Sequence, residues 1–311
     1  MRIRKSKQHV VGVLLHSFFS IVLVIAVLSF FSCKEKEKTT FHSQIVSQTL
    51  LNETEMFHKD GVDTYKINYK SDGLQIEGFI ARPTQYKANI KLPAIIYCRG
   101  GNQSFGAISD YQLKIINSLA ARGFVVLASQ LRGNMYSQGV DEFGGKDVND
   151  ILKLIDIAKD LHFVDTKNIH VFGISRGGMN TYQVSKLSDD INSIAIVGSP
   201  TNILSLSKFR PKMYTKVMQP LIGDSLTKRK EYEARSAIFW HNKLNEPTLI
   251  LHGTDDSRVQ EEEARKLVDS FTMSNKKDFQ FKVFEGGNHS LSNFEEERNE
   301  LIFNWFKKNK K

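Results

Sequence analysis

The sequence predicts an α/β fold in which a mostly parallel central sheet is covered by helices on both faces. Short apolar runs, such as IIYC at 95–98 and VVLAS at 125–129, are typical of strands buried on both sides. Segments with helical periodicity, such as 146–160, alternate with these runs, and this order is typical of parallel sheets. The chain has 311 residues, of which 41% are hydrophobic and 25% charged, so it suffices for one large globular domain.

The domain is predicted to begin with an antiparallel hairpin, because residues 62–69 and 74–81 alternate in polarity around the turn signal SDG at 71–73. Further strands and helices then follow in alternation. The strands are predicted at 94–98, 123–129, 169–172, 194–198, 248–251 and 279–284, and the helices at 109–121, 146–160, 176–187, 259–272 and 292–308.

Residues 200–240 interrupt this alternation, because they show no strand pattern between two predicted strands and are rich in Lys, Arg, Met, Tyr and Phe. An insertion of this length above a sheet often forms a helical cap over an active site. The alternative is a plain helical excursion away from the site, and the sequence leaves both interpretations open.

The N-terminal segment has the layout of a targeting signal. Residues 1–9 carry four basic side chains and no acidic one, and an apolar run at 10–32 leads directly to Cys33. A cysteine after Ser32 resembles the lipidation site of a bacterial lipoprotein, whereas the length of the run also fits an uncleaved transmembrane anchor. Either interpretation predicts a bacterial cell-envelope protein that is tethered to the membrane, with its catalytic domain outside the cytoplasm. We therefore divide the chain into a signal peptide or anchor at 1–32, a tether at 33–61 and a domain at 62–311.

The charge and cysteine content exclude several classes of function. The net charge is +9, but the basic residues are scattered and form no basic helix face interleaved with aromatic residues, which argues against a nucleic-acid partner. After Cys33 the remaining cysteine is Cys98, which ends an apolar run and is expected to be a buried thiol. No cluster of Cys and His has the spacing of a zinc site, so we expect no metal and no cofactor.

The sharpest chemical signal is the run GISRGG at 173–178, which follows a predicted strand and opens a predicted helix. A strand, a tight turn and a helix place Ser175 at a strained elbow, with its hydroxyl exposed at the edge of the sheet. Gly173 and Gly177 are expected there because a Cβ at either position would strike the neighbouring strand or helix. Ser175 is therefore the candidate nucleophile.

A serine hydroxyl needs a base, and His289 is the best placed of the nine histidines. It lies in the run EGGNHS at 285–290, between the last predicted strand and the last helix, at the same edge of the sheet as the elbow. The carboxylate that orients it is expected in the run HGTDDSRV at 252–259, where spacing alone does not separate Asp255 from Asp256. The chain order of Ser, Asp and His is that of the α/β-hydrolase fold.

Acyl transfer also needs two donors for the oxyanion that forms on the substrate. One is expected to be the backbone N–H of Arg176, and the other that of Gly101 in the glycine loop RGGN at 99–102. The side chain of Arg176 has two interpretations: a ligand for an anionic group of the substrate, or a salt bridge on the elbow helix.

Together these motifs resemble the catalytic domain of the prolyl oligopeptidase family of serine peptidases, over residues 62–308. The resemblance implies that the acid is Asp256, four residues after His252, and that His252 is structural. Two departures stand out, since Arg176 replaces the usual aromatic residue after the nucleophile and the glycine loop lacks its usual His and Pro. The motifs that carry the resemblance are GF at 123–124, LRGN at 131–134, Asp165 before the strand at 169–172, RSAI at 235–238 and HGTxDxxV at 252–259.

The resemblance implies a serine hydrolase that works through an acyl-enzyme on Ser175 and acts as a peptidase on short peptides. The family's peptidases carry a large β-propeller, for which we expect no room in this chain. Lone domains of this kind include esterases similar to dienelactone hydrolase, so a carboxylesterase acting on small molecules or glycan esters is the alternative. A non-catalytic binding protein on a hydrolase scaffold is the alternative from another class.

Overall fold

The computed structural model describes residues 41–51, 59–87 and 89–311. The expected signal or anchor at 1–32, the candidate lipidation site Cys33 and the first part of the tether lie outside the described residues. In the part that is described, no helix combines the length and the apolar character that a membrane crossing requires.

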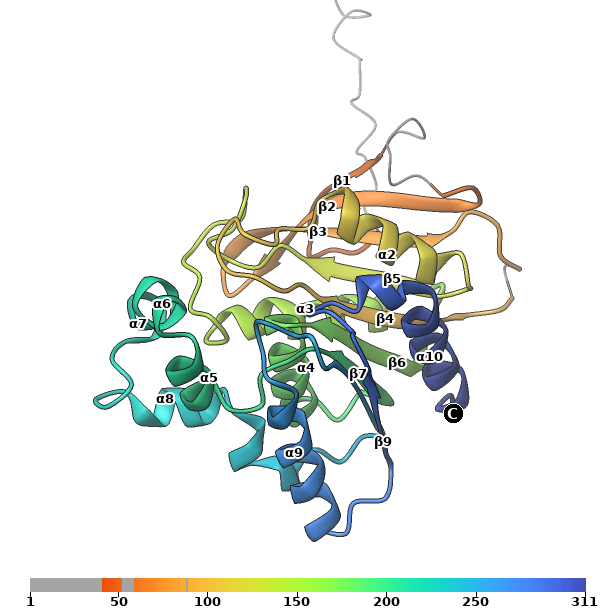
Figure 1. The fold of residues 1–311 in the computed structure, drawn as a ribbon. Helices are drawn as coiled ribbons and strands as arrows, with labels where there is room; N and C mark the ends of the chain where they lie inside the picture. Colours follow the sequence, from red (N-terminus) through yellow and green to blue (C-terminus); the bar gives the residue numbers. More distant parts are fainter. Residues whose placement is uncertain (1–40, 52–58, 88) are drawn as a thin grey trace, which may run out of the picture. The chain divides into compact units, whose positions relative to one another are not determined.

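A nine-stranded sheet forms the centre of the described domain (Figure 1). Its strand order is β1-β2-β3-β5-β4-β6-β7-β8-β9. The three pairs β1-β2, β2-β3 and β3-β5 at one end are antiparallel. The remaining pairs, from β5-β4 through to β8-β9, are parallel. The strands are β1 (Ile45–Leu50), β2 (Val62–Ser71), β3 (Leu74–Pro83), β4 (Leu92–Cys98), β5 (Val125–Ser129), β6 (Val164–Ile174), β7 (Ser193–Val197), β8 (Thr248–Gly253) and β9 (Phe279–Phe284).

The register of the β2-β3 hairpin is determined by its turn. Asp72 and Gly73, the two residues between the strands, both have positive φ, at 48° and 78°. Two such residues match the right-handed twist of the flanking strands, so the turn sets the register in which Ser71 faces Leu74.

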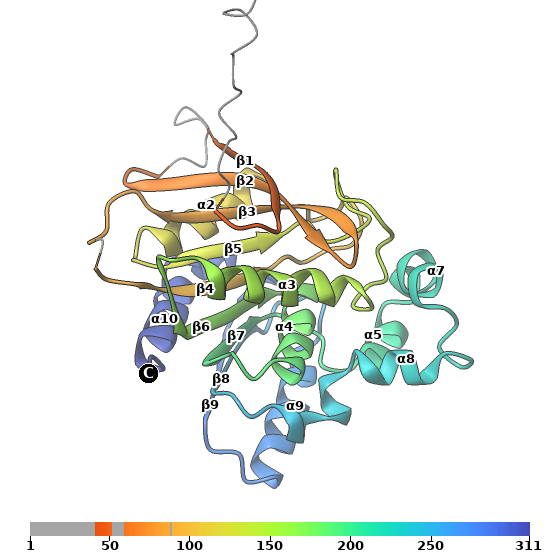
Figure 2. The same ribbon diagram turned by 180° about the vertical axis from the view of Figure 1, so that it is seen from behind.

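Helices cover both faces of the sheet, and each face has its own apolar core (Figure 2). Successive residues of a strand point to opposite faces, so Ile96 of β4 joins one core and Ile95 the other. Because both faces are buried, the central strands are apolar throughout. The first core is covered by α3 (Asp147–Asp160), α4 (Arg176–Leu187) and α9 (Glu261–Met273), and the second by α2 (Asp110–Ala120) and α10 (Glu295–Lys308).

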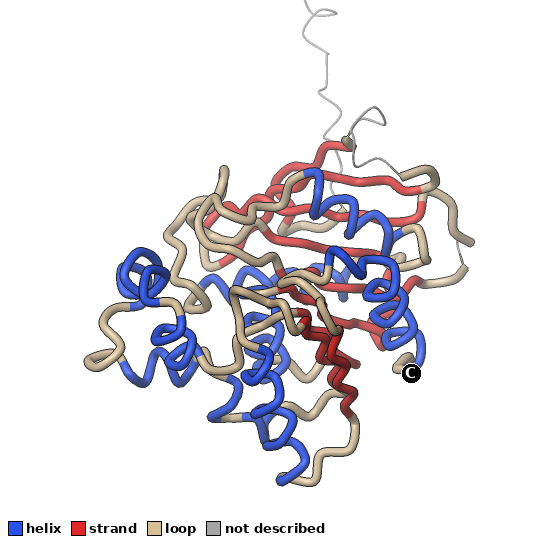
Figure 3. Tube along the Cα trace, viewed as in Figure 1, coloured by secondary structure: helices blue, strands red, loops and turns tan. Residues whose placement is uncertain are grey.

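The predicted fold class is confirmed, and each predicted strand and helix overlaps one in the structure (Figure 3). One prediction needs correction, because part of the expected tether at 33–61 belongs to the sheet. Residues 45–50 form β1, which pairs antiparallel with β2. Only Ile45 of this strand is buried, so the run IVSQTL lacks the alternation by which a half-buried strand is found.

Residues 200–240, called the helical insert below, follow β7 and are helical as predicted. The insert contributes Ile203, Met218 and Tyr232 to a small third core, which also contains Met179 of α4 and Phe143 before α3. Its elements are α5 (Ile203–Phe209), α6 (Pro211–Met213), a π-helical turn (Tyr214–Met218), α7 (Gln219–Ile222), α8 (Arg229–Ala234) and a short 3₁₀ turn (Ala237–Phe239).

Candidate active site

Ser175 forms the elbow between β6 and α4, with φ 61° and ψ −128°. A positive φ is strained for a residue other than glycine, and such strain is common at functional sites. The two flanking glycines make the turn sterically feasible. A Cβ on Gly173 would lie 2.2 Å from the carbonyl oxygen of Gly177, and a Cβ on Gly177 would lie 2.0 Å from that of Cys98. The backbone contacts that the sequence predicted for these glycines are therefore present.

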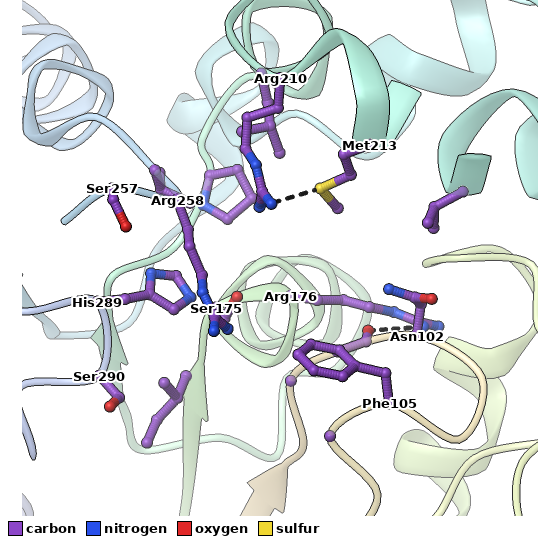
Figure 4. A pocket seen from close by; sticks show the side chains of 18 of the residues that line it. Asn102, Phe105, Ser175, Arg176, Arg210, Met213, Ser257, Arg258, His289 and Ser290 are labelled. Atoms are coloured by element: carbon purple, nitrogen blue, oxygen red, sulfur yellow. Dashed lines mark hydrogen bonds between the residues drawn. The ribbon is translucent and has the colours of Figure 1, made fainter. Parts of the chain in front are cut away.

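His289 and Asp256 lie together at the same edge of the sheet. The Nδ1 atom of His289 is 2.8 Å from each carboxylate oxygen of Asp256. The other ring nitrogen, Nε2, has no hydrogen-bond partner among the described residues. His289 and Ser175 line one cavity, and Figure 4 shows the imidazole beside the serine. With Nδ1–H donated to Asp256, Nε2 is left with a lone pair that can accept a proton.

Asp256 is held by more than His289. The Nε2 atom of His252 lies 3.1 Å from one of its carboxylate oxygens, and the backbone N–H groups of Arg258 and Val259 donate to the other. Burial alone would raise the pKa of Asp256, but the hydrogen bonds from His252 and His289 lower it below its usual range. This carboxylate therefore stays ionised beside the imidazole.

The structure separates the two aspartates that spacing could not. The side chain of Asp255 is exposed, and its backbone N–H donates to the carbonyl oxygen of Gly287. Asp256 instead turns inward to His289. His252, expected to be structural, contacts the same carboxylate and also the carbonyl oxygen of Val259 at 2.9 Å, so it positions Asp256.

The glycine loop after β4 lies against the elbow. A Cβ on Gly100 would lie 3.3 Å from that of Ser175, and a Cβ on Gly101 only 2.0 Å from the carbonyl oxygen of Phe105. Gly101, with φ +75°, lines the cavity together with Ser175 and Arg176. The backbone N–H groups of Gly101 and Arg176 are thus available near the nucleophile, and within the described residues neither has a recorded acceptor.

Arg99 organises this loop from inside. Its buried guanidinium donates to the carbonyl oxygens of Gly100, Gln103, Phe105, Gly106 and Gln130. Burial and the neighbouring charge of Arg176 lower the pKa of Arg99 to about 10. A cation that binds only carbonyl oxygens fixes the curvature of the backbone around it. This role of Arg99 was not predicted, because its carbonyl partners are brought together only by the fold of the loop.

The side chain of Arg176 is buried and forms salt bridges. Its guanidinium contacts Asp141 at 2.7 and 2.8 Å, Asp147 at 2.8 Å and the carbonyl oxygen of Gly101 at 3.1 Å. Asp141 also accepts the N–H of Gln103 in the glycine loop. Of the two interpretations of this side chain, the salt bridge is the one that the structure shows.

The cavity beside Ser175 has a volume of about 820 Å³. The helical insert forms one wall of it through Leu206, Arg210, Lys212, Met213 and Val217. Residues of the insert therefore lie over the site, as expected of a cap. Three cavity residues, Arg210, Lys212 and Arg258, were not predicted as site residues. For Arg258 the available signal was its position two residues after Asp256, and for the other two it was the content of Lys and Arg in the candidate cap.

No group of three or more His, Cys, Asp or Glu residues in the described part of the chain is arranged to hold a metal ion. The buried His170 is occupied elsewhere, since its Nδ1 contacts the hydroxyl of Ser193 at 2.9 Å and its ring stacks on Phe306. Burial lowers the pKa of His170 to about 3, so this histidine is a neutral core residue.

Comparison with known proteins places these features in a family. Residues 110–311 match the model described as the prolyl oligopeptidase family. The uncharacterized peptidase YtmA of Bacillus subtilis is 30% identical over 200 residues, which are 64% of this chain and 75% of that protein.

Two solved structures share the fold at low sequence identity. The acylaminoacyl peptidase of Pyrococcus horikoshii aligns with a TM-score of 0.71 at 21% identity, over 81% of this chain but 42% of that one. An esterase of Pyrococcus furiosus aligns with a TM-score of 0.65 at 16% identity, over 84% of this chain and 95% of that one. The chain therefore spans less than half of the peptidase and nearly all of the esterase.

Asp141→Asn is predicted to destabilise the protein, because it leaves the buried guanidinium of Arg176 without one of its two carboxylates. Such losses are typically ~3 kcal/mol or more in the free energy of unfolding. Burial would raise the pKa of Asp141, but Arg176 lowers it overall. As the pH falls through and below the ordinary pKa of aspartate, Asp141 is protonated in the unfolded chain but stays ionised in the folded one. Wild-type stability should therefore fall there more steeply than that of the variant.

Urea unfolding between about pH 3 and pH 7 measures both effects, over a range that spans the ordinary pKa of aspartate. Asp190→Asn is the matched control, since Asp190 forms an exposed pair with Lys159 and such pairs contribute about 0–1 kcal/mol. Equal losses in the two variants, or parallel pH profiles for Asp141→Asn and wild type, would contradict the assignment.

Proposed function

The chain belongs to the prolyl oligopeptidase family, and from this premise we propose that it is a peptidase that cleaves short peptides through an acyl-enzyme on Ser175. The family makes the protein a serine hydrolase. The observation that carries the proposal is the hydrogen-bonded pair of His289 and Asp256 at the wall of the cavity that Ser175 also lines.

In the proposed reaction, Nε2 of His289 takes the hydroxyl proton of Ser175 while the serine oxygen attacks the scissile carbonyl carbon. The carbonyl oxygen becomes an oxyanion and accepts hydrogen bonds from the backbone N–H groups of Arg176 and Gly101. His289 then gives the proton to the leaving amine, and the C–N bond breaks. Water, deprotonated by the same imidazole, then attacks the acyl carbon. The bond from that carbon to the oxygen of Ser175 breaks, and His289 returns the proton to the serine. Asp256 holds the tautomer and stabilises the imidazolium in both halves of the cycle.

Two observations support a short substrate. A cavity of about 820 Å³ falls in the ~300–1,000 Å³ range of small-molecule sites. The helical insert also forms one wall of it, and a cap in this position favours short substrates over long chains. A peptidase also agrees with the name of the relative from Bacillus subtilis.

A carboxylesterase is the second candidate, and one observation favours it. The cavity of about 820 Å³ has the size of a small-molecule site, so it can take a small ester as well as a short peptide. An ester presents a better leaving group than an amide, so an esterase on this site needs less subsite binding to position its substrate.

Substrate preference separates the two candidates. Initial rates are compared on p-nitrophenyl esters of graded acyl length and on aminoacyl and dipeptidyl p-nitroanilides, with Ser175→Ala as the blank. We expect turnover of the anilides. Ester turnover alone would instead identify an esterase. The absence of all turnover, together with no labelling of Ser175 by a fluorophosphonate, would leave a non-catalytic binding protein.

Asp256→Asn is expected to reduce kcat by about 10⁴-fold with little change in KM, because the amide stabilises the wrong tautomer of His289. Asp255→Asn is the matched control, since its side chain is exposed and makes no recorded contact with the imidazole within the described residues. Steady-state rates on one ester substrate measure both variants. A larger loss in Asp255→Asn than in Asp256→Asn would reverse the assignment of the acid.

We also propose that the domain is held at the bacterial cell envelope, outside the cytoplasm, through Cys33. The proposal is supported by the basic start, the apolar run at 10–32 and the Ser32-Cys33 step in the sequence. Palmitate labelling and fractionation of cells that express the full chain test it. Wild type should be labelled and membrane-bound, whereas Cys33→Ser should lose the label. An unlabelled wild type that stays in the membrane would favour the uncleaved anchor.

A further inference from the structure

We propose that the cavity beside Ser175 selects substrates that carry a carboxylate close to the scissile bond, and that Arg210, Lys212 and Arg258 bind this group. The inference rests on the proposed function, because it concerns which substrate the same site accepts.

The three cations reach the cavity from two separate parts of the chain. Arg210 and Lys212 lie where α5 meets α6 in the helical insert, and Arg258 lies in the loop after β8 that also holds Asp256. Figure 4 shows the side chains of Arg210 and Arg258 extending into the pocket, with the guanidinium of Arg258 beside Ser175. An anion bound by Arg258 would therefore lie next to the nucleophile.

None of these three cations is neutralised within the described residues. Arg210 has a 3.5 Å contact with the sulfur of Met213, and Arg258 lies 5.7 Å from the ring centroid of Phe105. No salt bridge involves either arginine or Lys212 in the described part of the chain. Arg176, which borders the same cavity, by contrast forms salt bridges with both Asp141 and Asp147.

The balance of charge in the cavity therefore favours an anion. Asp255 is the one acidic residue among the residues that line it. A concave site with an excess of one charge concentrates ligands of the opposite charge. The planar guanidinium matches a carboxylate with two parallel hydrogen bonds, and the lysine adds a point charge.

The same charges disfavour a substrate whose free amino group must enter the cavity. An ammonium group would meet three cations and a single, exposed carboxylate. A substrate carboxylate can come from two places: an acidic side chain in the acyl part, or the free C-terminus of the leaving part. Both sources share the chemistry that the three cations recognise.

Paired substrates distinguish the two sources. N-blocked Glu and Gln p-nitroanilides differ only in the charge of the acyl part, and N-blocked dipeptides with a free or an amidated C-terminus differ only in that of the leaving part. A p-nitrophenyl ester of glutaric acid and its valeric counterpart repeat the first comparison for an esterase. The full chain is assayed on each pair, and kcat/KM is compared within the pair.

We expect wild type to prefer the acidic member of at least one pair by roughly tenfold, the usual scale of one or two charge-assisted hydrogen bonds. The preference should shrink in about 0.5 M salt, because exposed charges are screened. In the double variant of Arg210→Gln and Arg258→Gln, kcat/KM for the acidic member of the pair should come within about twofold of that for the neutral member. The change should arise from a higher KM for the acidic substrate. Lys212→Gln should lower it by a smaller factor.

Lys216→Gln and Arg229→Gln are the matched controls, since both residues are exposed on the helical insert and neither lines the cavity. They should keep the wild-type ratio. Labelling of Ser175 by a neutral fluorophosphonate checks that each variant retains a folded site.

Turnover with equal kcat/KM within every pair would overturn the inference and leave the proposed function intact. So would a preference for acidic substrates that survives in the double variant. No turnover and no labelling of Ser175 would overturn the proposed function, and the inference with it.

Discussion

The geometry of the site depends on the salt bridges and hydrogen bonds that the buried guanidinium of Arg176 forms. It joins the elbow helix to the aspartates at 141 and 147 and to the carbonyl oxygen of Gly101. Asp141 in turn accepts the N–H of Gln103. One cation therefore fixes the nucleophile turn, the glycine loop and the segment before α3 relative to one another. The residue directly after the nucleophile, whose backbone N–H is the proposed donor to the oxyanion, thus also carries this anchor.

The two groups of cations around Ser175 differ in how their charge is satisfied. Arg99 and Arg176 are buried and bound to carbonyl oxygens or carboxylates, so they stabilise the backbone that they contact. Arg210, Lys212 and Arg258 face the cavity without such partners in the described structure. A cation whose partners lie within the protein is part of its framework, whereas one without them is free to meet a ligand. A substrate carboxylate is therefore expected to bind the second set.

Local pattern was enough to predict the sheet, its helices and the meeting of Ser175 and His289 at one edge, since periodicity and strand–turn–helix order are properties of neighbouring residues. The choice of Asp256 over Asp255 needed the family resemblance, because both follow β8 in the same loop. The partners of Arg176 could not be predicted, because Asp141 and Asp147 are about 30 residues away. Strand β1 was not predicted for another reason. Its pairing with β2, rather than any pattern in its own sequence, makes it a strand.

The small third core has a consequence for how this domain can diversify. Phe143 belongs to that core, and its ring centroid lies 4.7 Å from the Cζ atom of Arg176. Its carbonyl oxygen accepts a hydrogen bond from Nε of Arg235 at the end of α8. The insert therefore packs on Phe143 before α3 and on Met179 of α4, and the other buried residues of this core come from the insert itself. The side chains of the insert that face the cavity can therefore be substituted while the elbow and its buried ion pairs stay unchanged. Residues 203–234 are the part of the chain in which new selectivity can arise without rebuilding the chemistry.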